Sequence, residues 1–196
     1  MYQKYQTEAL VLQSRPMGEA DRMYVLYTRD FGLIRARASG ARKETSKMRY
    51  ALQHYSRATV GLIRGVRGWR LAGAIALETS ARKDTDSVRV FARLSDLVAK
   101  LVIGEEENPY LYEALSQTYE ALIGGWEGQT FPSPAATIEI VAVARILYAL
   151  GYISSEALKT ALFTHTAYAL EHLIEAESIR EDLLLSINRA LSETHL

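Results

Sequence analysis

The segment Leu33–Ser39 carries two arginines, Arg35 and Arg37, at alternating positions between apolar or small residues. Successive side chains of a β-strand point to opposite faces, so this alternation predicts a strand with Ile34, Ala36 and Ala38 facing a core. The two arginines would then face solvent, roughly 7 Å apart, which is close to the repeat of a nucleotide backbone. Each guanidinium could contact a different phosphate, and the pattern indicates a polyanion-binding surface.

The stretch Gly40–Arg49 follows directly and is rich in basic and hydroxyl-bearing residues. Its positive charges are Arg42, Lys43, Lys47 and Arg49. Lysine and arginine neutralise phosphates and release counterions, and serine and threonine hydroxyls donate hydrogen bonds to phosphate oxygens. A solvated loop without a ligand is the alternative interpretation. Its place beside the alternating arginines favours phosphate contact.

Catalytic chemistry has no comparable pattern in this sequence. There is no cysteine, which excludes disulfides, thiolate metal sites and a cysteine nucleophile. No phosphate-binding glycine loop, nucleophile elbow or HExxH pattern occurs. The histidines are interpreted as surface or interface residues; they are His54, His165, His172 and His195. We therefore expect no catalytic residues, no metal, no cofactor and no enzymatic activity.

The charges are divided unevenly along the chain. Residues 1–83 contain 16 basic and 6 acidic residues, a net charge of +10, whereas residues 84–196 contain 7 and 17, a net charge of −10. A basic half of this kind attracts polyanions, although the division could also arise by chance on two solvated surfaces. We expect two domains, residues 1–82 and 83–196.

The first half has the period of about two that is typical of strands. The expected strands are Thr7–Ser14, Arg22–Thr28, Gly32–Ser39, His54–Leu62 and Trp69–Thr79. Turn-prone stretches separate them, beginning with Arg15–Gly18, so the pattern predicts a barrel or a sandwich. In the last segment a common core face is expected for Trp69, Leu71, Ile75 and Leu77, and core packing is favoured over base stacking for Trp69.

The second half has helical spacing and an acidic surface. One apolar stripe contains Phe91, Leu94, Leu97, Val98 and Leu101. Further helices are expected from Asn108–Pro109 to Gly124–Gly125, from Ser133–Pro134 to Gly151, over about Ser155–Glu175, and from a capping box at Ser178–Glu181 towards Leu191. The half is thus predicted to be an all-α bundle.

Several of these segments, in this order, resemble the bacterial RecO family of DNA repair and recombination mediator proteins. In the first half the matching pieces are Thr7–Leu12, Gly18–Arg22, Thr28–Arg35, Ala38–Lys43 with Ser46, and Leu52–Gln53. In the second half they are Phe91–Leu94 with Leu97, Asn108–Leu115, Ile146–Leu147 and Leu150–Tyr152. Many members of the family carry a four-cysteine zinc module after the glycine-tyrosine pair, and this chain has no cysteine there.

The resemblance implies an α+β protein, with an N-terminal five-stranded OB-fold barrel followed by an all-α helical domain and no zinc module. It implies binding to single- and double-stranded DNA and annealing of complementary strands. It also implies a role with RecR in loading RecA onto DNA coated by single-strand-binding protein, whose acidic C-terminal tail would contact the helical domain. The role of residues 154–196 stays open.

Phosphate contacts are assigned to basic residues of the first half: Arg15, Arg22, Arg35, Arg37, Arg42, Lys43, Lys47 and Arg49. For the acidic protein tail, the expected contacts are Arg89, Arg93 and Lys100, because their spacing places them on one side of a helix. The alternative function is a protein-interaction adaptor whose basic barrel docks an acidic partner. A polar start, Met1–Glu8, and the lack of a long apolar run predict a cytoplasmic protein without a membrane span.

Overall fold

A computed structural model describes residues 3–77, 85–124, 135–158 and 160–194. The chain divides into two compact units, one formed by Met1–Thr79 with Val102–Pro109 and the other by Ser80–Leu101 with Tyr110–Leu196. The domain boundary expected at residues 82–83 lies outside the described residues. No helix in the described parts of the chain is long and apolar enough to cross a membrane.

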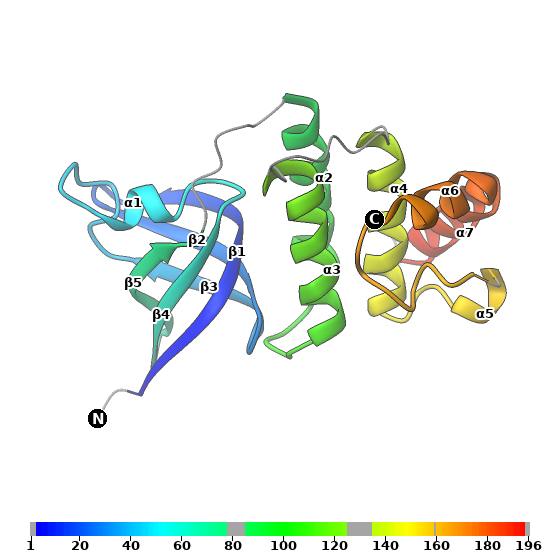
Figure 1. The fold of residues 1–196 in the computed structure, drawn as a ribbon. Helices are drawn as coiled ribbons and strands as arrows, with labels where there is room; N and C mark the ends of the chain where they lie inside the picture. Colours follow the sequence, from blue (N-terminus) through cyan, green and yellow to red (C-terminus); the bar gives the residue numbers. More distant parts are fainter. Residues whose placement is uncertain (1–2, 78–84, 125–134, 159, 195–196) are drawn as a thin grey trace. The chain divides into compact units, whose positions relative to one another are not determined.

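The first unit is a closed barrel of five strands in the order β1-β2-β3-β5-β4 (Figure 1). The strands are β1 (Lys4–Met17), β2 (Asp21–Thr28), β3 (Gly32–Ala38), β4 (Arg57–Gly65) and β5 (Gly68–Ala76), with the short helix α1 (Met48–Ala51) between β3 and β4. β3 and β5 are parallel, and the other neighbours are antiparallel. The expected OB-fold barrel of five strands is confirmed.

The core of the barrel follows the alternation of the strands. Ile34, Ala36 and Ala38 are buried while Arg35 and Arg37 are exposed, as the pattern of β3 predicts. At one end of the barrel, Tyr5, Phe31 and Trp69 pack against one another with ring centres 5.2 to 5.5 Å apart. Trp69 is thus a core residue, as expected.

β1 continues to Met17, into the stretch Arg15–Gly18 where the sequence predicts a turn. Arg15, Pro16 and Met17 pair with Met23, Arg22 and Asp21 on β2, and the turn begins at Gly18. β4 pairs only with residues 4–10 of β1, so the later part of β1 has no strand on its other side. A proline without a backbone N–H is tolerated at such an edge.

The prediction that Ile75 and Leu77 share the core face of Trp69 and Leu71 is wrong. The pairing of β5 with β4 shifts between Gly61 and Leu62, which leaves Ala72 as an extra residue on β5. An extra residue moves every following side chain to the opposite face. Ile75 and Leu77 are therefore 72% and 40% exposed.

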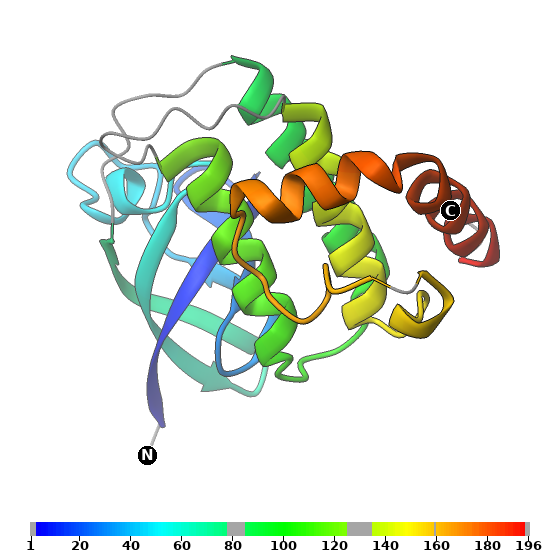
Figure 2. The ribbon, with the colours of Figure 1, turned by 45° about the vertical axis from the view of Figure 1, so that its right-hand side comes forward.

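The second unit is all helical, as predicted, and its helices surround α4 (Ala135–Ala149). The others are α2 (Thr85–Leu101), α3 (Pro109–Tyr119) with the π-helical turn η1 (Glu120–Gly124), α5 (Ser155–Leu158), α6 (Leu170–Ser178) and α7 (Arg180–Glu193). α4 packs against α2, α6 and α7, and its central place is visible in Figures 1 and 2. α3 begins at Pro109 and α4 is followed by Gly151 with a positive φ, as predicted, whereas Gly125 and Ser133–Pro134 lie outside the described residues.

Two helix predictions in the C-terminal part are wrong. The expected helix over Ser155–Glu175 is interrupted, because α5 ends at Leu158 and α6 begins only at Leu170. The expected capping box is absent, since the Ser178 hydroxyl donates to the Glu175 carbonyl and Ile179 occupies the position before α7. The physical reason for the interruption is the buried side chain of Arg145.

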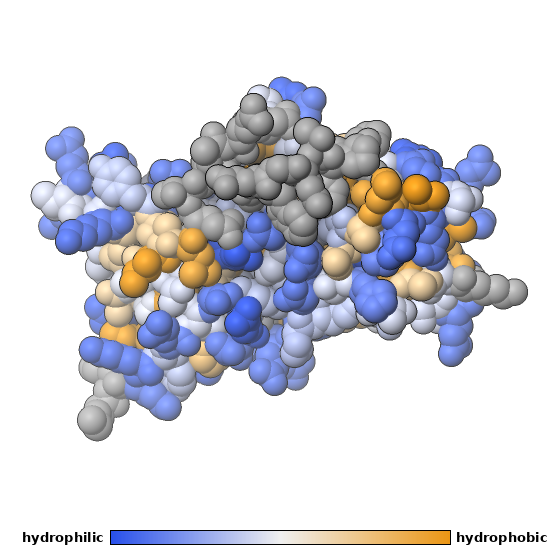
Figure 3. Space-filling model, in the orientation of Figure 1, coloured by the Kyte–Doolittle hydropathy of each residue, from blue (hydrophilic) through white to orange (hydrophobic). Residues whose placement is uncertain are grey.

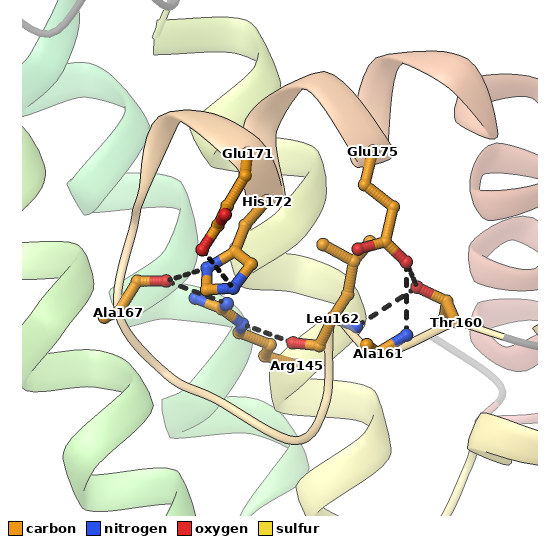
Figure 4. Close-up of polar contacts among 8 residues, drawn as sticks. All are labelled: Arg145, Thr160, Ala161, Leu162, Ala167, Glu171, His172 and Glu175. Atoms are coloured by element: carbon orange, nitrogen blue, oxygen red, sulfur yellow. Dashed lines mark hydrogen bonds and ion pairs between the residues drawn. The ribbon is translucent and has the colours of Figure 1, made fainter.

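Arg145 lies on α4 with none of its surface exposed, and it holds the segment 160–169 in a non-helical conformation (Figure 4). Its guanidinium donates to the backbone carbonyls of Leu162 at 3.1 Å, Thr166 at 2.6 Å and Ala167 at 3.1 Å. In a helix these carbonyls would point along the helix axis, whereas here they point at the guanidinium. The charge of Arg145 is thus satisfied by three neutral oxygens.

Candidate nucleic-acid interface

Arginines line up across the outer surface of the barrel. Arg37 on β3 pairs with Arg70 on β5 and with Met23 on β2, and Met23 pairs with Arg15 on β1. Paired residues on neighbouring strands point to the same face and lie about 5 Å apart. Arg15, Arg37 and Arg70 therefore form one exposed row that crosses four strands. Arg70 was not among the expected site residues, because its place depends on the parallel pairing of β3 with β5, which local pattern does not reveal.

The two arginines of β3 differ in their surroundings. Arg37 donates from Nε to Oδ2 of Asp21 at 2.7 Å, and its terminal nitrogen lies 2.5 Å from the same oxygen. Arg35 is exposed and makes no ion pair within the described residues. The charge of Arg35 is thus available to a ligand, whereas the charge of Arg37 is already balanced.

Asp21 also fixes the start of the basic loop, which we define as Gly40–Arg49. Its Oδ1 accepts a hydrogen bond from the backbone N–H of Gly40 at 2.8 Å. This bond, followed by the one from Arg37, holds the pKa of the Asp21 carboxyl below its ordinary value of 3.8. The Asp21 carboxylate on β2 therefore contacts β3 through Arg37 and the loop through Gly40.

The loop after β3 is anchored to the turn between β1 and β2. The Arg42 backbone N–H donates to the Ala20 carbonyl at 2.9 Å, and its guanidinium donates to the Gly18 carbonyl at 2.7 Å. Arg42, Lys43 and Lys47 are exposed and make no ion pair within the described part of the chain. Figure 3 shows hydrophilic side chains over this end of the barrel, where Figure 1 places the loop.

A hollow of about 390 Å³ opens between this loop, α1 with the residues after it, and the start of β2. It is lined by Arg22, Tyr24, Ala41, Arg42, Arg49, Leu52, Gln53 and His54. Arg22 occupies an inward-facing position of β2, where it pairs with Ala38, and its guanidinium donates to the Ser14 hydroxyl at 2.6 Å. The same hydroxyl lies 2.9 Å from Nε2 of His54. Three of the expected phosphate-binding arginines thus meet at one hollow.

An exposed aromatic ring adjoins the hollow. Tyr50 on α1 is 65% exposed, and the guanidinium carbon of Arg49 lies 5.2 Å from the centre of its ring. Exposed tyrosines beside basic groups are suitable for stacking on nucleic acid bases. Neither Tyr50 nor His54 is among the site residues predicted from the sequence. The adjacency of an aromatic residue to Arg49 was the available signal for Tyr50.

A second hollow of the barrel, about 420 Å³, has a different character. It lies over β1, β4 and β5, where Gly61 faces Gly73 across the two strands, and Ile75 forms part of its lining. Figure 3 shows apolar side chains gathered over this part of the barrel. Its largely apolar lining is less suited to phosphate than the arginine-lined hollow.

The residues expected to contact an acidic protein tail lie exposed on α2, and two of them have carboxylate partners. Arg93 makes two hydrogen bonds of 2.6 Å to Glu139 on α4, which raise the pKa of its guanidinium. Arg89 lies 3.2 Å from Asp86. Lys100 is exposed in the last turn of α2.

No group of three or more acidic, histidine or cysteine side chains that could hold a metal ion occurs within residues 3–77, 85–124, 135–158 and 160–194. His165 and His172 are close, with stacked rings 5.7 Å apart, and His172 Nδ1 lies 3.2 Å from the Ala167 carbonyl.

The comparisons with known proteins agree with the barrel and its order of segments. The family model described as "Recombination protein O N terminal" matches residues 1–69. "DNA repair protein RecO" of Pelotomaculum thermopropionicum is 32% identical over 123 residues, which is 62% of this chain and 48% of that protein. The proteins of the same name from Geobacter metallireducens and Heliobacterium modesticaldum are 29% and 39% identical over 74% and 50% of this chain, and over 58% and 35% of their own lengths.

The chain spans about half the length of the first of these relatives. The similarity includes the whole of β1, β2 and β3, the basic loop and the arginine-lined hollow, all of which lie within residues 1–69. Residues 1–69 are therefore similar to the N-terminal part of RecO proteins, and the matched relatives are named DNA repair proteins.

Proposed function

We propose that this chain is a non-enzymatic mediator of DNA repair and recombination that binds single-stranded and duplex DNA through the basic end of its barrel. The observation that carries the proposal is the group of basic side chains without ion pairs in the described structure: Arg15, Arg22, Arg35, Arg42, Lys43, Lys47, Arg49 and Arg70. Positive charges that are not balanced within the protein are free to neutralise phosphates. The proposed site of action is the cytoplasm.

Annealing of complementary strands follows from the same surface. Two DNA strands repel one another because both are polyanions, and a basic surface that neutralises phosphates of both strands lowers this repulsion. Holding the strands together also raises their effective concentration. The reaction needs no bond to be made or broken, so it requires no catalytic group.

The partners implied by the family are RecR and the C-terminal tail of single-strand-binding protein, with loading of RecA on the coated DNA as the outcome. The support from the described residues differs among the tail contacts. Lys100 has an exposed positive charge. Arg89 would have to leave Asp86, and Arg93 would have to leave Glu139, before either could pair with a carboxylate of the tail. We therefore propose Lys100 as the first contact to test.

The test of DNA binding is fluorescence anisotropy of a labelled single-stranded oligonucleotide across a salt series. A protein with Arg35→Gln, Lys43→Gln and Lys47→Gln should bind more weakly. The slope of log affinity against log salt should fall by about 2, because each phosphate that the protein no longer neutralises lowers the slope by about 0.7. The matched control replaces Arg89, Arg180 and Arg189 by glutamine, since these three arginines pair with carboxylates.

The control should bind with the slope of the unmodified protein. Equal slopes for all three proteins would contradict the assignment of the DNA-binding surface. Retention of an acidic protein partner in the presence of excess DNA would favour the adaptor function instead.

A further inference from the structure

We propose that the arginine-lined hollow is a dedicated phosphate-binding site that receives one phosphate group of the bound strand, with the neighbouring base on Tyr50. The inference rests on the proposed function and deepens it, because it assigns one phosphate group of the DNA to a defined site within the wider basic surface of the barrel. The observations that carry it are the convergence of three arginines, the anchoring of two of them by neutral groups and the apolar floor beneath them.

The three guanidiniums come from three different segments. Arg22 belongs to β2, Arg42 to the loop after β3, and Arg49 to α1, and all three line the hollow. None of them has a carboxylate partner within the described residues. Three positive charges that share one hollow repel one another, and an anion removes this repulsion.

Neutral acceptors orient two of these arginines. Arg22 uses one terminal nitrogen for the Ser14 hydroxyl, and Arg42 uses one for the Gly18 carbonyl. A guanidinium has five N–H donors, so most donors of each group remain for a ligand. Side chains that are held before binding lose less conformational freedom when the ligand arrives.

The floor of the hollow increases the strength of such contacts. Tyr24, Ala41 and Leu52 line it and are at most 3% exposed, and Ala41 and Leu52 belong to the core of the barrel. Charge-assisted hydrogen bonds between arginine and phosphate are stronger where water is excluded on one side. The volume of about 390 Å³ is much larger than the roughly 30 Å³ of one water molecule, and it accommodates a phosphate with part of its sugar.

Tyr50 makes the site suitable for a nucleotide, because its ring can bind a base beside the phosphate. It follows Arg49 directly and exposes 65% of its surface, so a base can stack on its ring while the phosphate beside that base reaches Arg49. The phosphate can be an internal diester with one negative charge or a terminal monoester with about two. The arginines would bind both kinds of phosphate in the same way. Oligonucleotides with and without a terminal phosphate distinguish the two cases.

The first measurement follows the side-chain Nε–Hε NMR signals of the arginines in the full chain during titration with inorganic phosphate. The signals of Arg22, Arg42 and Arg49 should shift together, and the signals of Arg35 and Arg70 should shift much less. Arg49→Gln should weaken phosphate binding about tenfold, which is the effect of removing one charge-assisted hydrogen bond. Arg49 is exposed on a short helix, so this variant keeps the fold.

The second measurement compares oligonucleotides with a 5′-phosphate, a 3′-phosphate or no terminal phosphate. Tighter binding of one phosphorylated form, abolished in Arg49→Gln, identifies a terminal phosphate as the ligand. Equal binding of the three forms, with all of them weakened in Arg49→Gln, identifies an internal phosphate.

Arg35→Gln with Lys47→Gln distinguishes this inference from the proposed function. It should weaken oligonucleotide binding while leaving the phosphate-induced shifts of Arg22, Arg42 and Arg49 unchanged. Uniform small shifts of all arginines would overturn the dedicated site while leaving the DNA-binding proposal in place. Phosphate-induced shifts without any oligonucleotide binding would support the site and contradict the DNA-binding proposal.

Discussion

The guanidinium carbon of Arg145 lies 4.7 Å from the centre of the Tyr168 ring, and both side chains are buried in the helical unit. Tyr168 in turn shares a hydrogen bond of 2.8 Å with the Thr118 hydroxyl on α3. The segment 160–169 is thus held between α4 and α3 by one arginine and one tyrosine. These contacts give the loop between α5 and α6 its conformation.

Replacement of Arg145 by methionine should destabilise the helical unit by about 3 kcal/mol, because three buried carbonyls lose their donor. The measurement is hydrogen exchange of the amides of α4 and α6, together with urea unfolding. Arg189→Met is the matched control, since the Arg189 side chain is 83% exposed, and it should change stability by less than about 0.5 kcal/mol. Equal effects of the two substitutions would show that the carbonyl contacts contribute little.

The sequence predicted the barrel well because each of its first strands has one buried face. The alternation along Leu33–Ser39 predicted that the side chains of Arg35 and Arg37 face solvent. This prediction depends on one strand alone and not on its pairing with others. The prediction failed beyond Leu71, because the extra residue on β5 arises from pairing with β4. In the helical half it failed over 160–169, where Arg145 on another element decides the conformation.

The candidate site was predicted only as a set of charges. That Arg22, Arg42 and Arg49 meet at one hollow depends on the turn at Gly18 and on α1, which bring separate segments together. The pairing of Arg37 with Asp21 follows from the alignment of β2 with β3, 16 residues apart in the chain. Contacts of this kind have no periodic signal in a single sequence.

Gly32 is predicted to be the glycine of the barrel least tolerant of substitution. It has a φ of +59°, and a Cβ at this position would lie 2.0 Å from the carbonyl oxygen of Glu106. Gly32→Ala should cost about 3 kcal/mol in the free energy of unfolding, from the backbone conformation and the steric overlap together. Gly18→Ala is the control, because Gly18 has a similar φ of +66° and no atom within 4 Å of the added Cβ. It should cost only about 1 kcal/mol, and equal unfolding midpoints for the two variants would contradict the steric argument.

Asp21 links the stability of the barrel to pH. Because its folded pKa lies below the ordinary value of 3.8, its contribution to stability is complete above that value and is lost as the pH falls through the folded pKa. The difference in unfolding free energy between the unmodified protein and Asp21→Asn should therefore be largest near pH 7 and shrink below about pH 4. Urea unfolding at pH 7 and pH 3 measures it. A difference that is unchanged at pH 3 would show that the charge of Asp21 is not the cause.

The same substitution should increase the salt dependence of DNA binding. Asp21→Asn leaves Arg37 without a carboxylate, so that Arg37 can contact a phosphate beside Arg35. Neutralising one more phosphate raises the slope of log affinity against log salt by about 0.7 for a single strand. Arg29, which pairs with Glu8 elsewhere on the barrel, supplies the control: Glu8→Gln removes a carboxylate from that pair and should leave the slope unchanged. A lower slope for Asp21→Asn would mean that ordering of the loop matters more than the charge of Arg37.

Tyr50 should contribute to single-strand binding through stacking alone. Base-aromatic stacking is worth about 1–3 kcal/mol for each base, so Tyr50→Ala should weaken binding of a single-stranded oligonucleotide about fivefold or more. Tyr50→Phe keeps the ring and should bind like the unmodified protein. The sharpest measurement uses a strand that lacks a base at every position, because it retains all phosphates. Such a strand should bind the unmodified protein and Tyr50→Ala equally, and a weaker affinity for Tyr50→Ala would show that the tyrosine acts by holding Arg49 in place instead.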